Sequence, residues 1–262
     1  MNLIRFIAHL SMSSLNVRTI RSYISGVRSW ALSLGHPELP TQDRQVQLAL
    51  RSLSISHPPP SQAQPITFPI LAAMLSRISE LPDSLMYSSL FTLIYFACLR
   101  ASEVCPRAPT AFTPTRSNLQ LINAASPYLI YRVPKSKTMP HGFQAYVGCS
   151  SAPICAVCLA AQYFSSSPAP PQAPLFATAA GQVISYDLLN STLKSLIASI
   201  GLNPAAYSTH SLRAGAATQA ARSGLDESSI QRLGRWRSSA YKQYLRPPPT
   251  SACRFAKHLV QN

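Results

Sequence analysis

The segment HSLRAGAATQAARSGLDESSIQRLGRWRSSAYKQYLR, residues 210–246, decides the fold. Apolar residues recur along it at steps of three and four, the spacing that gathers them on one face of a helix. The pattern predicts short helices at residues 210–223, 226–233 and 238–245. His210 and Arg213 would share one face of the first helix, near the N-terminal end that attracts anions. The segment therefore indicates a helical frame that presents an imidazole and a guanidinium to a phosphate.

The second half of the segment adds three aromatic side chains with polar groups. Trp236 follows Leu233-Gly234-Arg235, and Tyr241 and Tyr244 lie on the last short helix, before three consecutive prolines. An indole suits a core position, but its N–H is also a hydrogen-bond donor. The pattern alone leaves both structural and functional roles open for these side chains.

Further helices precede this segment, and one of them ends in a charged residue. The apolar periodicity predicts them over residues 70–78, 83–104 and 185–200. Arg100 lies near the end of the most apolar of them, where a guanidinium is costly to bury unless it is paired or functional. Glu103, three residues further on, could hold it in place.

A β-hairpin is predicted between these helices. β-branched and aromatic residues fill 128–133, and residues 143–147 form a matching run across a turn that contains proline and glycine. Lys135 and Lys137 lie at the tip of this hairpin, although basic hairpin tips are commonly just solvated. Several helices with one hairpin predict a mainly α protein with a small antiparallel β-sheet, in the α+β class.

The N-terminal region, residues 1–56, is predicted to be helical. An amphipathic stretch runs from Asn16, a plausible N-cap, to Leu34, and Gly35 with Pro37 ends it. Its apolar side is formed by Val17, Ile20, Ile24, Val27, Trp30, Ala31 and Leu34, and its other side carries Arg18, Arg21 and Arg28. The proline-rich segment 57–65 predicts a semi-rigid linker and the domain boundary.

The charge of the chain favours a polyanionic partner. Its 262 residues include 23 Lys and Arg against 8 Asp and Glu, for a formal net charge of +15. Because charge of one sign dominates a chain in which 12% of residues are charged, we expect nucleic acid as the partner. The alternative is a protein that is merely kept soluble by its charge. The longest apolar run, residues 90–99, is too short to span a membrane, so no membrane partner is expected.

The basic and aromatic sites, taken in order, resemble a known family. Arg100, a hairpin lysine, the His210-x-x-Arg213 pair, Trp236 and a tyrosine about thirty residues after Arg213 look like the catalytic set of the tyrosine recombinases, which include the phage integrases. The match covers residues 66–250, and its last part looks most similar to the recombinases of DIRS-type retrotransposons and Cryptons. The resemblance implies a catalytic domain over 66–262, preceded by a helical core-binding (SAM-like) DNA-binding domain over 1–56 that is truncated at its start.

The resemblance also implies how a DNA strand would be cut. Arg100 and Arg213 would clamp the non-bridging oxygens of the scissile phosphate as charge develops on them. Tyr244 would be the nucleophile, with Tyr241 as the runner-up, and would form a 3′-phosphotyrosyl link that conserves the bond energy for rejoining.

Three further residues would complete this chemistry. His210 would help to take the phenol proton or brace the phosphate, Lys137 would protonate the departing 5′-oxygen, and Trp236 would donate one more hydrogen bond. Lys135 would contact the DNA backbone, as would Arg18, Arg21 and Arg28. Neither a catalytic metal nor another cofactor is expected.

The resemblance is incomplete at Trp236, at Cys98 and in the number of N-terminal helices. Trp236 stands where most of the family has His, although Trp is a variant there, and it precedes Tyr244 by eight residues, about one fewer than expected. Cys98 stands where a Gly is usual before Leu-Arg. Two or three helices are predicted before the linker, where the family's core-binding domain usually has four.

The expected partner is double-stranded DNA, on which the protein would act as a homo-oligomer, a dimer to a tetramer, in the recombination or integration of a mobile element. A type IB topoisomerase and an inactive DNA-binding derivative are the alternatives. The expected compartment is the nucleus. Arginines and serines without an acidic residue before Glu38 also fit a mitochondrial transit peptide, the minor alternative.

Six cysteines raise the question of a metal. They are Cys98, Cys105, Cys149, Cys155, Cys158 and Cys253. No secretory signal pattern is recognised, so free thiols in a reducing compartment are expected. Cys155 and Cys158 form a C-x-x-C with Cys149 nearby, but a structural zinc site needs four ligands and usually two such pairs. We therefore expect no metal here.

Overall fold

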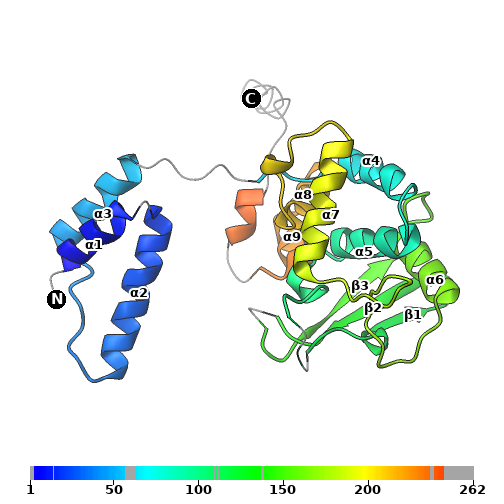
Figure 1. The fold of residues 1–262 in the computed structure, drawn as a ribbon, viewed down its shortest axis with the longest axis horizontal. Coiled ribbons are helices and arrows are strands. Elements are labelled where there is room, and N and C mark those ends of the chain that lie inside the picture. The colour runs from blue at the N-terminus through cyan, green and yellow to red at the C-terminus, as the bar shows by residue number, and fades with distance from the viewer. Residues whose placement is uncertain are drawn as a thin grey trace, which may run out of the picture. The chain divides into compact units, whose positions relative to one another are not determined.

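The computed structural model divides the chain into two compact units, Met1–Gln62 and Ala63–Asn262 (Figure 1). The residues it describes are 3–13, 15–56, 63–108, 110, 112–136, 139–236 and 239–244, with the backbone alone at 240, 243 and 244. The boundary lies within the segment 57–65, of which residues 57–62 are outside the described residues. The N-terminal and C-terminal units are described in turn.

The N-terminal unit consists of three described helices, α1 (Leu3–Met12), α2 (Val17–Ser33) and α3 (Arg44–Ser56). Asn16 caps α2, and its side-chain oxygen accepts a hydrogen bond from the N–H of Thr19 at 2.9 Å, so the predicted helix start is confirmed. The core of this unit is formed by Leu3, Ile7, Ile20, Ile24, Val46 and Leu50.

The predicted apolar face of α2 is only partly buried. Trp30 is 65% exposed and Leu34 is 56% exposed, which corrects the expectation that both would pack inside. The reason is length, because α2 runs beyond the ends of the shorter α1 and α3 that cover its first half (Figure 1). Arg18 and Arg21 are exposed, and Arg28 forms an ion pair with Glu38.

The C-terminal unit is built around the apolar helix α5 (Ser84–Phe96), which packs against α6 (Ala156–Ser166), α8 (His210–Arg222) and α4 (Phe68–Ile78). Two further helices, α7 (Tyr186–Ser199) and α9 (Glu227–Gly234), contact α4 and α8 respectively. The predicted helices at 70–78, 185–200, 210–223 and 226–233 are confirmed, whereas the predicted last helix is a 3₁₀ turn, η4 (Ser239–Tyr244). Within the described part of the chain, none of the helices has the length and apolar character needed to cross a membrane.

An antiparallel sheet lies along one side of this unit, next to α5 (Figure 1). Its order is β1 (Leu119–Ile122), β2 (Tyr128–Val133) and β3 (Phe143–Gly148). The predicted hairpin is confirmed, with Val133 opposite Phe143 at its tip and Tyr128 opposite Gly148 at its base. Burial alternates along β2, since Leu129, Tyr131 and Val133 face the core. The mainly α fold with a small sheet is therefore confirmed, and β1 adds a strand that the sequence did not reveal.

The predicted helix over 83–104 is wrong at its C-terminal end. Helix α5 ends at Phe96, and Cys98 follows with a φ of 48°, in the left-handed region that Gly adopts most easily. A short 3₁₀ turn, η1 (Ala101–Glu103), comes next, so Arg100 lies in extended backbone between two elements. This left-handed backbone agrees with the resemblance to tyrosine recombinases, in which Gly is usual at the position of Cys98.

Gly215 of α8 marks a close approach that permits a stability prediction. A Cβ added there would lie 1.7 Å from the carbonyl oxygen of Ile66, which is rigid backbone because the Ile66 N–H donates to the Ser211 carbonyl at 2.9 Å. We expect Gly215→Ala to lower the free energy of unfolding by at least about 2 kcal/mol, measured by urea denaturation. Gly148→Ala, where a Cβ meets nothing within 4 Å, is the control and should change it by less than about 0.5 kcal/mol. Equal stability of the two variants would contradict this packing.

Candidate active site

The candidate site is organised by one buried carboxylate. Glu103 is 2% exposed, and its Oε2 accepts the Arg100 backbone N–H while its Oε1 accepts the Arg100 guanidinium, both at 2.8 Å. The hydroxyl of Ser136 donates to the same Oε1 at 2.7 Å and accepts from the Arg100 guanidinium at 3.2 Å. Arg100 is thus held by three contacts, with its side chain 21% exposed.

The contact with Ser136 brings the hairpin loop to this carboxylate. Ser136 and Met139 exchange backbone hydrogen bonds of 3.0 and 3.3 Å across the loop. Lys137, which follows Ser136 in the chain, lies outside the described residues. The described side of the loop is therefore anchored beside the Arg100–Glu103 pair, although β2 and η1 are distant in the sequence.

A second arginine, Arg235, binds the turn that precedes Arg100. Its guanidinium donates to the carbonyl oxygens of Ala97 at 3.2 Å and Cys98 at 2.9 Å, and it lies 3.8 Å from Oε2 of Glu103. Its own backbone is left-handed, with a φ of 55°. Burial lowers the pKa of Arg235 to about 10, and the Glu103 carboxylate opposes that effect. Arg235 therefore joins the end of α9 to the turn after α5.

A third arginine, Arg213, comes from the first turn of α8. It is 2% exposed, its guanidinium donates to the Gly234 carbonyl, and it stacks 4.6 Å from the ring centroid of Trp236. Arg213 lies near Arg235, because its guanidinium bonds the carbonyl of Gly234, and its own carbonyl lies 3.7 Å from the sulfur of Cys98, in the turn that Arg235 binds. Burial raises the pKa of the Cys98 thiol to about 11, while the charges of Arg213, Arg235 and Arg100 all oppose that rise.

His210 is the first residue of α8 and is exposed, unlike Arg213 one turn later. The residue before it, Thr209, is buried and lies 2.9 Å from the hydroxyl of Tyr186. The exposed Arg107 stacks on the Tyr186 ring at 4.2 Å from its centroid. The N-terminal end of α8 thus carries an imidazole with a second basic side chain close by, which sequence reasoning missed.

The two candidate nucleophiles differ in what the structure records of them. Tyr241 is buried, donates to Oε2 of Glu227 at 2.8 Å and packs 5.9 Å from the Trp236 ring. The hydrogen bond to Glu227 raises the pKa of Tyr241. The backbone of Tyr244 ends η4, and its side chain lies outside the described residues.

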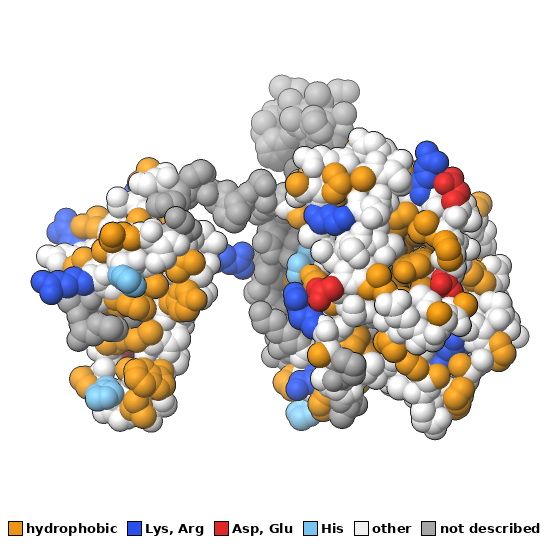
Figure 2. All heavy atoms as spheres, in the orientation of Figure 1, with side chains coloured by type: hydrophobic (Ala, Val, Ile, Leu, Met, Phe, Trp, Pro, Cys, Tyr) orange, Lys and Arg blue, Asp and Glu red, His pale blue; other side chains and the backbone are white. Residues whose placement is uncertain are grey.

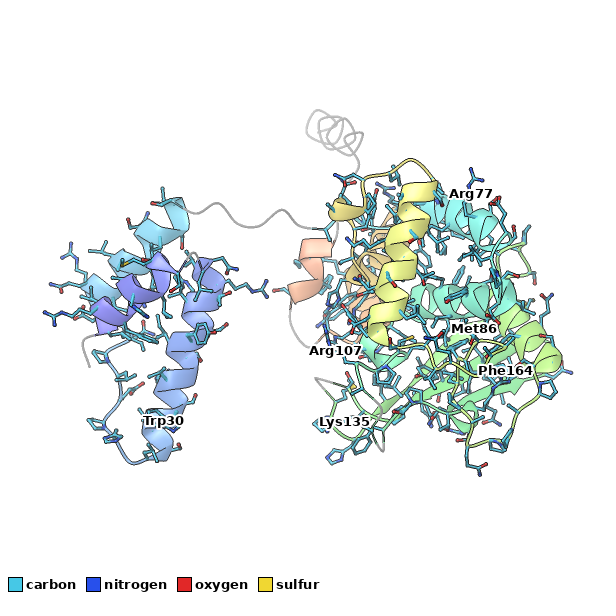
Figure 3. The ribbon with its side chains drawn as sticks, viewed as in Figure 1. Trp30, Arg77, Met86, Arg107, Lys135 and Phe164 are labelled. Carbon is cyan, nitrogen blue, oxygen red and sulfur yellow. The ribbon has the colours of Figure 1, made fainter. Side chains whose placement is uncertain are left out.

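Basic side chains gather on one edge of the C-terminal unit. Arg107 and Lys135 lie on the same edge in Figure 3, and Figure 2 shows Lys, Arg and His side chains along it. Lys135 is exposed, with its Nζ 4.8 Å from the ring centroid of Phe112. A hollow of ≈ 370 Å³ lies beside Arg235 and Trp236, bordered by Met139 and by residues of α9. This edge can receive a polyanion.

Sequence reasoning found part of this arrangement. It singled out Arg100, Glu103, Arg213 and Trp236, and the structure brings them into one cluster. It missed Arg235 and Ser136, whose roles depend on contacts with residues far away in the chain. One signal was present for Arg235, since it directly precedes Trp236 in the run Leu233-Gly234-Arg235-Trp236.

The structure is similar to those of several integrases and recombinases solved with DNA. They include the Tn1549 transposon integrase with transposon right-end DNA, at 14% identity and a TM-score of 0.63 over 99% of this chain and 84% of that one. XerH recombinase bound to a palindromic difH substrate is 14% identical, with a TM-score of 0.63 over 97% of this chain and 68% of that one. A lambda integrase dimer bound to a core site is 14% identical, with a TM-score of 0.51 over 92% of this chain and 75% of that one. No family model and no curated protein matches the sequence. The chain therefore has the tyrosine recombinase fold.

Proposed function

We propose that this chain breaks and rejoins DNA strands as a site-specific recombinase, through a covalent 3′-phosphotyrosyl intermediate. The observation that carries the proposal is the arginine cluster, in which Arg100 and Arg235 lie at the Glu103 carboxylate and Arg213 is bound to the carbonyl of Gly234, the residue before Arg235. Among the described residues, the positive charges of these arginines beside the negative charge of Glu103 leave an excess of positive charge in a partly buried place. A scissile phosphate would supply the missing negative charge.

The geometry supports different roles for the three arginines. Arg100 and Arg213 would bind the non-bridging oxygens of the phosphate, where charge develops during attack. Arg235 uses its donors on the carbonyls of Ala97 and Cys98, so it would fix the turn that carries Arg100. A clamp held in this way needs little reorganisation when the phosphate reacts.

The remaining groups would move protons around the phosphate. His210 would take the phenol proton of Tyr244 or brace the phosphate, and Lys137 would give a proton to the departing 5′-oxygen. Trp236 lies against Arg213 and would pack the site while its indole N–H serves as a donor. Each step needs side chains alone, and the phosphotyrosyl bond keeps the energy required for religation.

The N-terminal unit would add DNA contacts of its own. Arg18 and Arg21 are exposed on α2 and are free of the ion pair that Arg28 makes with Glu38, so we propose them as the stronger phosphate contacts. Lys135 would contact the backbone from the hairpin loop. The protein would serve a mobile element and would act in the nucleus, as a dimer or tetramer on DNA.

The proposal is tested by covalent trapping on a nicked suicide substrate, which releases the cut end and so accumulates the protein–DNA adduct. We expect the adduct to form equally well in excess EDTA, because guanidiniums and an imidazole supply the charge that metal ions supply in other nucleases. The measurement is the fraction of protein shifted on a denaturing gel. Loss of the adduct on chelation, with recovery on adding magnesium, would contradict the mechanism.

DNA affinity should depend strongly on salt. The formal net charge of +15 predicts many phosphate contacts, each of which releases counterions. Raising salt from about 50 to about 200 mM should weaken binding by roughly 10³-fold, measured by fluorescence anisotropy with a labelled duplex. Arg18→Ala and Arg21→Ala together should reduce the slope of log K against log salt by about 2. An affinity that barely changes with salt would show that the charge serves another purpose.

A further inference from the structure

Three cysteines from two elements meet at the base of the hairpin. Cys149 follows the last residue of β3, Cys155 is the N-cap residue of α6, and Cys158 lies in the first turn of that helix. The sulfur of Cys149 lies 3.5 Å from that of Cys155 and 3.8 Å from that of Cys158, and all three sulfurs lie within 4.8 Å of one another. All three thiols are free.

This spacing is that of thiolates around a metal ion. In a tetrahedral site with metal–sulfur bonds of about 2.3 Å, neighbouring sulfurs stand about 3.8 Å apart. Two of the three sulfur pairs match this edge length within a few tenths of an ångström, and the third, between Cys155 and Cys158, lies within 4.8 Å. The side chains therefore need little movement to bind an ion at their centre.

We propose that Cys149, Cys155 and Cys158 form a three-thiolate site for a soft metal ion, with zinc as its ordinary occupant. In the described part of the chain no further His, Cys, Asp or Glu joins the group, so the fourth position would be open to solvent. Cys155 is 1% exposed, whereas Cys158 is exposed, so an ion would enter from the side of Cys158. No metal was expected from the sequence, because one C-x-x-C pair with Cys149 nearby falls short of four ligands, whereas the fold brings the sulfur of Cys149, just after β3, against that pair.

The surrounding backbone favours thiolates at this place. Cys155 is buried and is the N-cap residue of α6, at the end of the helix that attracts anions. A negatively charged sulfur at a helix N-terminus is stabilised in the same way as other anions. On binding the ion, the three thiols would lose their protons.

The site would fasten a loop rather than take part in the cutting of DNA. It ties the loop 149–155 between the end of β3 and the start of α6, and the Cys149 N–H adds a bond to the Pro127 carbonyl at 2.8 Å. The base of the hairpin lies about 17 Å along the strands from its tip at Val133 and Phe143, where the candidate active site is. Metal binding should therefore change stability and leave strand cleavage unchanged.

The test uses the full chain, purified without a histidine tag, reduced and stripped of metal. Titration with Co²⁺ under anaerobic conditions should give a sulfur-to-cobalt charge-transfer band that saturates at one ion per chain and is displaced by Zn²⁺. Zinc at about a hundredfold above its Kd should raise the Tm by roughly 5 °C, and a chelator should reverse the rise.

Matched variants decide the assignment. Cys149→Ser and Cys158→Ser should each lose most of the cobalt band, whereas Cys253→Ser, a cysteine outside the described residues, should keep it. Far-ultraviolet circular dichroism checks that each variant is folded. Absence of the band while thiol titration counts all six cysteines reduced would overturn the proposal. So would a band that persists in both Cys149→Ser and Cys158→Ser.

Discussion

Tyr244→Phe is expected to abolish the covalent adduct with a suicide DNA substrate while DNA affinity stays unchanged. The substitution removes one hydroxyl, which would be the nucleophile, and retains the ring. Loss of a nucleophile that forms a covalent intermediate commonly lowers the rate by at least about 10⁴-fold, which places the adduct below detection. The measurement is the trapped fraction on a denaturing gel, beside anisotropy with the same duplex.

The contacts of Tyr241 support Tyr244 as the nucleophile. The hydroxyl of Tyr241 is already committed to Glu227, and that hydrogen bond raises its pKa, which disfavours the phenolate. Its ring packs against Trp236 and is buried, so it is suited to holding η4 on the end of α8 and α9. A buried phenol that donates to a carboxylate would have to leave both contacts to attack phosphorus.

Tyr241→Phe is the matched control for this assignment. It removes the bond to Glu227 and keeps the aromatic packing, so we expect slower adduct formation with no loss of the final product. A second control, Glu227→Gln, leaves an acceptor for Tyr241 and should behave like the parent protein. An adduct that survives Tyr244→Phe and disappears in Tyr241→Phe would exchange the roles of the two tyrosines.

Local patterns in the sequence predict the elements of this fold well. The hairpin and helices α2 and α7 to α9 follow from the periodicity of apolar residues, with the capping residue Asn16 at the start of α2, and these signals depend on neighbours within a few positions. The end of α5 was not predictable in this way. Apolar periodicity does not indicate that the backbone of Cys98 is left-handed, although the resemblance places a Gly there, and Arg235 binds this turn from another element.

The candidate site, too, could be predicted only in part from the sequence. Residue types and order were enough to single out Arg100, Arg213 and Trp236, because a phosphate needs such donors. The contact of Ser136 with Glu103 and the meeting of Cys149 with Cys155 and Cys158 depend on how β2 and β3 are placed beside the helices. No spacing rule in one dimension encodes those distances.

Lys137→Ala is expected to cut normal DNA slowly and to cut DNA with a bridging 5′-sulfur at nearly the parental rate. A general acid is needed because an alkoxide leaves poorly, and such a group contributes about 10²- to 10⁴-fold. A thiolate leaves without a proton, so sulfur substitution should remove the need for Lys137. The readout is the single-turnover rate of adduct formation on the two substrates.

Lys135→Ala separates this role from simple DNA contact. Lys135 is exposed and stacks on Phe112, so its charge faces solvent at the edge where the DNA backbone would pass. Its loss should weaken binding and lower both rates alike. Ser136 lies between the two lysines in the sequence, and its side chain is bonded to Arg100 and Glu103 of the proposed phosphate clamp.

Ser136→Ala adds a test of that anchor. It removes the hydroxyl that joins the hairpin loop to Glu103 and leaves Lys137 in the chain. If the anchor positions the general acid, the variant should be slow on normal DNA and partly rescued by the bridging sulfur, as Lys137→Ala is. Rescue in Lys135→Ala alone would exchange the roles of the lysines. Equal defects on both substrates in all three variants would place the proton donor on another element, with His210 at the start of α8 as the next group to replace.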